Sequence, residues 1–196
     1  MGSRYLGYIL LSSLLSSIIF LSGCSSTDEK IDTITSASTT LEAPDLRIPS
    51  EIVVTDALGQ EIVFENPPEK IATISPTATE MLYAAGGTAI LRDRASNFPT
   101  EAQSLPDVGS AYEPSIETIV RSQPDLILIE ALTQARFAGI FAESGLKVVA
   151  IRAESVDDVL GNISMIGKII GKESIAEKAV SDIQDRLALI ETEDNR

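Results

Sequence analysis

The side chains that could do covalent or metal chemistry in this 196-residue chain are few. The chain has one cysteine, Cys24, so it cannot form an intrachain disulfide, and it has no histidine. Without histidine it lacks the general base of Ser-His-Asp and Cys-His catalysis and the commonest zinc ligand. No GxGxxG or P-loop pattern appears either. We therefore expect no catalytic residues, no metal ligands and no resident cofactor.

Cys24 follows a segment with the features of an export signal. Arg4 precedes an apolar run from Tyr5 to Leu21, and two small residues lie directly before the cysteine. This order is typical of a secretory signal peptide. The sequence Leu-Ser-Gly-Cys at 21–24 resembles the bacterial lipobox, which implies that residues 1–23 are removed and that the Cys24 thiol receives a diacylglycerol. The alternative is an uncleaved transmembrane anchor, but the run is somewhat short, since about 20 mostly apolar residues are needed.

Residues 24–50 are predicted to be a lipidated, flexible tether. They are rich in serine and threonine and show neither helical nor strand periodicity, so they cannot bury enough apolar surface to become ordered. Beyond the signal the chain carries 14 Lys and Arg against 29 Asp and Glu, because Arg4 is the one charge before Cys24. Such an acidic balance argues against nucleic acid as a partner, which requires basic patches.

Order is expected from about residue 51, beginning with a β-hairpin. Two β-branched stretches, residues 52–55 and 61–64, flank a turn that contains Gly59. Short apolar strands then alternate with helices. The predicted strands are 71–75, 89–91, 126–129 and 147–151, and the predicted helices are 78–85, 115–123 and 134–143. Near-continuous apolar strands between helices indicate a Rossmann-like α/β fold with a parallel sheet that is covered on both faces.

Two helices are predicted at the end of the chain. Ser155 can cap the first, whose apolar stripe runs to Gly171. Ser174 opens the second, which would be a long helix of about 25–30 Å. The sequence stops soon after this helix, at Arg196.

Several segments, taken together and in this order, resemble substrate-binding lipoproteins of ABC importers for cobalamin, siderophores and haem. The resemblance covers nearly all of residues 52–191, and it rests on these sequences: Val-Thr-Asp-Ala-Leu-Gly at 54–59, Pro-Glu-Lys-Ile at 68–71, Ser-Pro-Thr-Ala-Thr-Glu-Met-Leu-Tyr-Ala-Ala-Gly at 75–86, Asn-Phe-Pro at 97–99, Leu-Pro-Asp-Val-Gly at 105–109, Pro-Ser-Ile-Glu at 114–117 and Pro-Asp-Leu-Ile-Leu at 124–128.

The resemblance implies two α/β lobes that are joined by one long helix, with ligand bound in the cleft between them. Residues 51–153 would form the N-terminal lobe, and residues 154–196 would include the joining helix. The C-terminal lobe is absent, so a truncated product is expected. The implied partners are an ABC permease and a corrinoid, siderophore or haem. The implied location is the cell membrane, lipid-anchored and facing the periplasm or the cell exterior.

Ligands of open α/β sheets bind beyond the carboxyl ends of the strands, which predicts a set of binding loops. From these loops we select Thr77, Arg92, Arg94, Asn97, Phe98 and Tyr112 as ligand-binding residues. The two aromatic residues would give flat apolar contact, and the resemblance places an aromatic at Tyr112. They would otherwise be ordinary core or surface aromatics. The two arginines would meet an anionic ligand, or alternatively make surface ion pairs.

Glu80 has two interpretations. By resemblance it matches a glutamate on the lobe surface that docks onto arginines of the permease. Alternatively, Thr77 and Glu80 form a capping box, in which the glutamate folds back onto the Thr77 amide.

Two other functional classes share features with this sequence. A zinc- or manganese-binding importer lipoprotein would share the helix-joined architecture, but it would use histidine ligands, which this chain lacks. An autonomous one-lobe surface lipoprotein with an adhesive or sensory role is the alternative that the missing lobe leaves open.

Overall fold

The computed structural model describes residues 51–194, with side chains described up to residue 190. The sequence predictions for Cys24, the signal peptide and the tether at residues 24–50 lie outside these residues. Within residues 51–194, no helix is long and apolar enough to cross a membrane.

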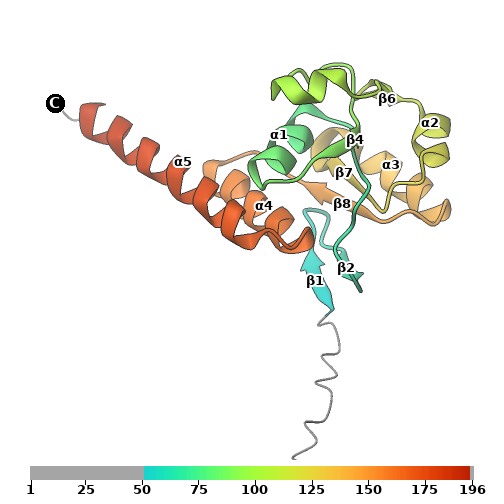
Figure 1. The fold of residues 1–196 in the computed structure, drawn as a ribbon, viewed down its shortest axis with the longest axis horizontal. Coiled ribbons are helices and arrows are strands. Elements are labelled where there is room, and N and C mark those ends of the chain that lie inside the picture. Colours follow the sequence, from blue (N-terminus) through green and yellow to red (C-terminus); the bar gives the residue numbers. More distant parts are fainter. Residues whose placement is uncertain (1–50, 195–196) are drawn as a thin grey trace, which may run out of the picture. The chain divides into compact units, whose positions relative to one another are not determined.

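The described part is built on a four-stranded parallel sheet of order β4-β3-β7-β8 (Figure 1). The strands are β3 (Ile71–Thr73), β4 (Ala89–Leu91), β7 (Leu126–Glu130) and β8 (Val148–Ile151). Their side chains alternate between two apolar cores. Leu126, Leu128 and Val149 enter one core, and Ile127, Ile129 and Ala150 enter the other. Because both faces are buried, the strands read as continuous apolar runs, and the predicted parallel α/β fold is confirmed.

Helices cover the two faces of the sheet. Helix α1 (Pro76–Ala84) and helix α4 (Val156–Ile169) supply Leu82 and Ile163 to the first core. Helix α2 (Ile116–Arg121) and helix α3 (Ala131–Glu143) supply Ile119 and Phe141 to the second core. Between β4 and α2 the chain forms a 3-10 helix, η1 (Thr100–Ser104), and two short antiparallel strands, β5 (Gly109–Ser110) and β6 (Glu113–Pro114).

The predicted hairpin is present as strands β1 (Ile52–Thr55) and β2 (Glu61–Phe64), which pair antiparallel. Asp56 joins it to the sheet. The buried Asp56 carboxylate accepts hydrogen bonds from the backbone N–H groups of Leu58 and Gln60, at 2.9 Å each, and from that of Ala150 in β8, at 3.1 Å. One side chain therefore closes the hairpin turn and fastens it to β8.

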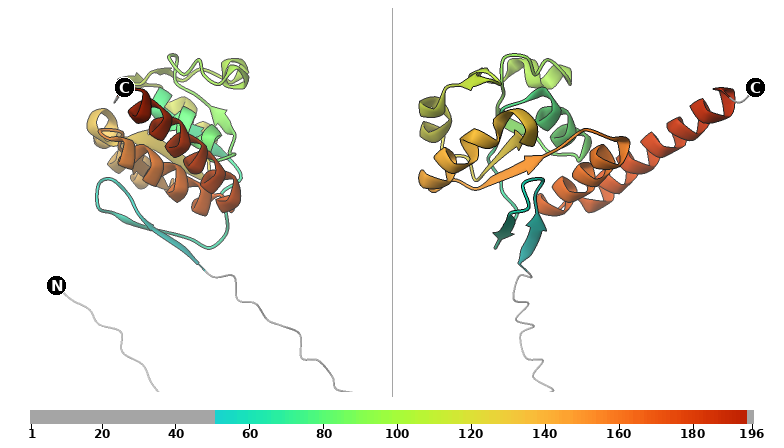
Figure 2. Two further views of the ribbon diagram at one scale, coloured as in Figure 1. Left: turned by 90° about the vertical axis from the view of Figure 1, so that its left-hand side faces the viewer. Right: turned by 180° about the vertical axis from the view of Figure 1, so that it is seen from behind.

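Helix α5 (Glu173–Asp194) leads away from the sheet after packing along α4 (Figures 1 and 2). Its 22 residues correspond to a length of about 33 Å. Ala176 of α5 is fully buried, and a Cβ atom added at Gly167 of α4 would lie 2.3 Å from the Ala176 Cβ. The two helices can therefore approach this closely because residue 167 has no side chain.

Two predicted helix starts are wrong. Helix α1 begins at Pro76, because the Ser75 hydroxyl caps it by accepting from the Ala78 N–H. Helix α3 begins at Ala131, three residues before the predicted start at Gln134, because the Glu130 carboxylate accepts from the first free N–H groups of the helix.

Candidate functional site

The candidate site lies at the carboxyl edge of the parallel sheet, where the segments that follow β3, β4, β7 and β8 emerge together. A groove of about 360 Å³ opens there. It is lined by side chains from three helices, α1, α4 and α5, and from the segments that follow β4 and β8. The lining residues are Pro76, Thr77, Glu80, Met81, Ala84, Phe98, Ala153, Val159, Ile163 and Ile183.

The groove brings together three of the residues selected from the sequence: Thr77, Glu80 and Phe98. Its surface is otherwise mainly apolar, which suits a ligand with hydrophobic faces. Phe98 is 66 % exposed, so it is not a core aromatic. The contributions of α4 and α5 were not predicted, because Val159, Ile163 and Ile183 belong to apolar stripes that a sequence assigns wholly to the core.

A buried chain of hydroxyl groups holds the loop of Phe98 against α1. Thr73 and Thr79 are joined at 2.7 Å between their hydroxyl oxygens, and Thr79 donates to Ser96 at 2.8 Å. Ser96 donates in turn to the buried Asp93, which also accepts from the Ala95 N–H. These hydroxyl and carboxylate groups are buried and hydrogen-bonded to one another. The wall of the groove that carries Phe98 is therefore held in place before any ligand arrives.

Gln134 positions the turn that carries Tyr112. Its buried amide donates to the backbone oxygens of Ile74 and Ala111 and accepts from the Glu130 N–H. Arg136, two residues farther along α3, donates to the backbone oxygen of Tyr112. Tyr112 itself is 62 % exposed, so this aromatic is also outside the core. It does not line the groove of Phe98.

The two loop arginines are occupied within their own loop. Arg92 donates to the backbone oxygens of Asp93, Arg94 and Gln103. Arg94 forms an exposed ion pair with Asp107, at 3.3 Å between Nε and Oδ2. The hydrogen bond from the Gly109 N–H, helped by Arg94, lowers the pKa of the Asp107 carboxyl below its usual value. Neither arginine lines the groove, so their role toward a ligand stays a prediction.

Asn97 is exposed beside Phe98, and its backbone oxygen accepts a hydrogen bond from the Gln103 side chain at 2.8 Å. Its ligand role also stays a prediction. Within the described residues, no group of three or more His, Cys, Asp and Glu side chains is arranged to hold a metal ion.

Glu80 is exposed on α1, at the rim of the groove. The capping box that Thr77 and Glu80 were predicted to form is absent, because Ser75 is the residue that caps α1. The Glu80 carboxylate makes no hydrogen bond or ion pair to any described residue. One of its two interpretations is thereby removed, and the carboxylate is accessible to a partner.

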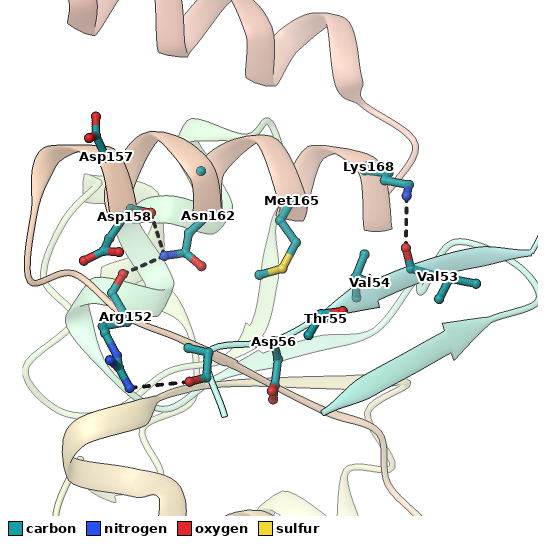
Figure 3. Close-up of a pocket in the computed structure, with 12 residues that line it drawn as sticks. Val53, Val54, Thr55, Asp56, Arg152, Asp157, Asp158, Asn162, Met165 and Lys168 are labelled. Carbon is teal, nitrogen blue, oxygen red and sulfur yellow. Dashed lines mark hydrogen bonds between the residues drawn. The ribbon is translucent and has the colours of Figure 1, made fainter. Parts of the chain in front are cut away.

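A second groove, of about 610 Å³, lies between β1 and α4 (Figure 3). Its polar side chains mostly bind the protein itself. Lys168 donates to the backbone oxygen of Val53 at 3.0 Å, and Asn162 donates to the backbone oxygens of Arg152 and Asp158. Asp158 caps α4 by accepting from the Ser155 N–H. We therefore assign this groove to the attachment of the hairpin to α4.

Comparison with known proteins found a matching family model and several relatives. The family model described as "Periplasmic binding protein" matches residues 71–193. An ABC transporter substrate-binding lipoprotein of Bacillus subtilis is 24 % identical over 182 residues, which cover 90 % of this chain and 55 % of that protein. A vitamin B12-binding protein of Pectobacterium carotovorum is 31 % identical over 124 residues, which cover 61 % of this chain and 45 % of that protein.

The fold has solved counterparts. A siderophore-binding protein, solved with acinetobactin and ferric iron, superposes with a TM-score of 0.65 at 20 % identity. The match covers 72 % of this chain and 54 % of that one, and it shows a shared fold. The chain spans about half the length of the curated relatives that it matches.

Proposed function

This chain belongs to the periplasmic binding protein family, and we propose that it is the solute-binding component of an ABC importer, which captures a cobalamin-like or ferric-siderophore ligand. The family consists of solute carriers, so the expectation that the chain is not an enzyme is confirmed. In the proposal, residues 51–153 form the N-terminal lobe and α5 is the helix that leads to a second lobe.

The observation that carries the proposal is the groove at the carboxyl edge of the sheet. It lies where open α/β sheets bind ligands, it is mainly apolar, and it carries an exposed aromatic, Phe98. The hydrogen-bonded side chains from Thr73 to Asp93 hold the wall of the groove in place. Less conformational entropy is therefore lost when a ligand binds.

Binding of a ligand to the full chain tests the proposal. Cyanocobalamin, a ferric trihydroxamate and haemin are each titrated into the chain in detergent, and heat is measured by calorimetry. We expect saturable one-to-one binding of cyanocobalamin or the trihydroxamate. Absence of binding by all three compounds would refute the ligand class that we propose.

We further propose that Cys24 carries a lipid that holds the protein at the outer face of the membrane. The support is the lipobox-like sequence and the similarity to a B. subtilis lipoprotein. Metabolic labelling with palmitate tests it. Incorporation is expected for the parent chain and is expected to be lost in Cys24→Ser, whereas equal labelling of both would exclude Cys24 as the site.

Glu80 is proposed to dock onto cationic side chains of the permease. Replacing it by arginine would reverse its charge, and we expect this change to reduce co-purification with the permease at least about tenfold, since juxtaposed like charges cost several kcal/mol. Pull-down from detergent-solubilised membranes measures the effect. Glu143→Arg is the matched control, because Glu143 is an exposed glutamate at the far end of α3. If Glu80→Arg and Glu143→Arg reduce co-purification with the permease equally, Glu80 has no specific role in docking.

A further inference from the structure

Leu132 is a large apolar side chain left in solvent at the carboxyl edge. It is 62 % exposed in the first turn of α3, directly after β7. Its backbone N–H is held by the Glu130 carboxylate at 3.0 Å, so its position is fixed. This exposed position was not predicted, because the helix was expected to begin at Gln134 and it begins at Ala131.

Helix α3, which carries Leu132, is fastened to the turn that carries Tyr112. Arg136 donates to the backbone oxygen of Tyr112, and residue 132 is on the same face of α3 as residue 136, one turn closer to the carboxyl edge. Gln134 ties the same turn to α3 through the Ala111 oxygen, at 2.8 Å. Two exposed apolar side chains, Leu132 and Tyr112, therefore come from adjoining segments that are fastened to each other.

The polar groups around this pair already have partners inside the protein. The Arg136 guanidinium contacts the Tyr112 oxygen and lies over the Phe137 ring. The Glu130 carboxylate caps α3. Glu113, next in sequence to Tyr112, is exposed, and its carboxylate has no hydrogen bond or ion pair to the described residues, so it adds negative charge. The exposed arginine of the β4–β5 segment, Arg94, is paired with Asp107.

We propose that Leu132 and Tyr112 form a second contact surface of the ligand site, which receives an apolar face of an uncharged ligand. This inference rests on the function proposed above and adds a specificity-determining residue to it. Leu132 offers hydrophobic area without a hydrogen-bonding group. Glu113 disfavours an anionic ligand, and the paired arginines offer few free donors to one. A neutral corrinoid or a neutral ferric hydroxamate therefore suits this surface better than haem with its carboxylates.

The test compares Leu132→Asn with Ile140→Asn in the full chain. Both replace an exposed branched side chain of α3 by asparagine, but Ile140, which is 44 % exposed, lies two turns farther from the carboxyl edge. Calorimetric titrations with cyanocobalamin, a neutral ferric trihydroxamate and haemin give the dissociation constants. We expect Leu132→Asn to weaken binding of the uncharged ligand about fivefold to tenfold, and Ile140→Asn to change it less than about twofold.

The outcomes separate the inference from the proposed function. If the parent chain binds an uncharged ligand and the two variants bind it equally well, this inference is wrong while the proposed function stands. If haemin binds more tightly than both uncharged compounds, the inference that this surface disfavours an anionic ligand is wrong. If the parent binds none of the three, the proposed function fails, and the inference fails with it. Tyr112→Ser, on the turn instead of the helix, provides a second variant with the same expected direction.

Discussion

Replacing Asp56 by alanine is expected to lower the free energy of unfolding by about 2–4 kcal/mol. Asp56 is 7 % exposed, and its carboxylate accepts three backbone N–H groups, from Leu58, Gln60 and Ala150. Removal of the carboxylate leaves these donors without a partner, and the one on β8 is buried. Hydrogen bonds to an ionised acceptor are roughly twice as strong as neutral ones. The expected loss of unfolding free energy is therefore larger than that of most single substitutions.

Urea denaturation of the full chain, followed by circular dichroism, measures this loss. Asp185→Ala is the control, because the Asp185 side chain is exposed on α5 and forms no hydrogen bond or ion pair with a described residue. We expect it to change stability by less than about 0.5 kcal/mol. A similar small change in Asp56→Ala would mean that the hairpin does not depend on this carboxylate.

Replacing Gly167 by alanine is expected to lower stability by about 2–3 kcal/mol, because the new methyl group overpacks the contact between α4 and α5. The added Cβ would lie 2.3 Å from the Ala176 Cβ, and 3.5 Å from the backbone oxygen of Lys172. The atom that it meets belongs to a fully buried alanine, which has no alternative rotamer. The helices must separate, and the groove that Ile183 lines would change with them.

Helix α4 contains its own control. Gly161 has no atom within 4 Å of an added Cβ, so Gly161→Ala should raise stability by about 0.5–1 kcal/mol through helix propensity. Thermal unfolding distinguishes the two variants, because the midpoint temperature should rise in Gly161→Ala and fall in Gly167→Ala. The double variant Gly167→Ala, Ala176→Gly moves the methyl group across the contact, and it should recover part of the loss. Loss of stability in Gly161→Ala equal to that in Gly167→Ala would refute the packing explanation.

Much of the fold could be predicted from the sequence, because its strands carry a strong signal. β8 and the first four residues of β7 are unbroken apolar runs, as strands buried on both faces must be. The errors fell at helix starts. Thr77 and Glu80 satisfy a capping-box pattern, but the cap is Ser75, with Pro76 as the first helical residue. Glu130 is not among the usual capping residues, so the true start of α3 was missed.

The candidate site could be predicted only in part. Residues that follow strands, such as Thr77 and Phe98, were found because the ends of parallel strands meet at one edge of the sheet. The contributions of Val159 and Ile183 depend on how α4 and α5 cross the lobe, which is a tertiary property. The occupation of Arg92 by backbone oxygens was equally hidden, because a sequence does not show how a loop folds back on an arginine.

The location of the bound ligand is the decisive test of the proposed binding site. Amide NMR spectra of the isotope-labelled full chain are recorded in detergent, with and without cyanocobalamin or a neutral ferric trihydroxamate. We predict that the largest shifts fall on the carboxyl-edge segments 75–80, 96–98, 111–113, 131–133 and 152–154. Segments 65–69 and 145–147, at the opposite edge of the sheet, should remain unchanged. Shifts concentrated at that opposite edge, or in the groove between β1 and α4, would contradict a ligand site at the carboxyl edge.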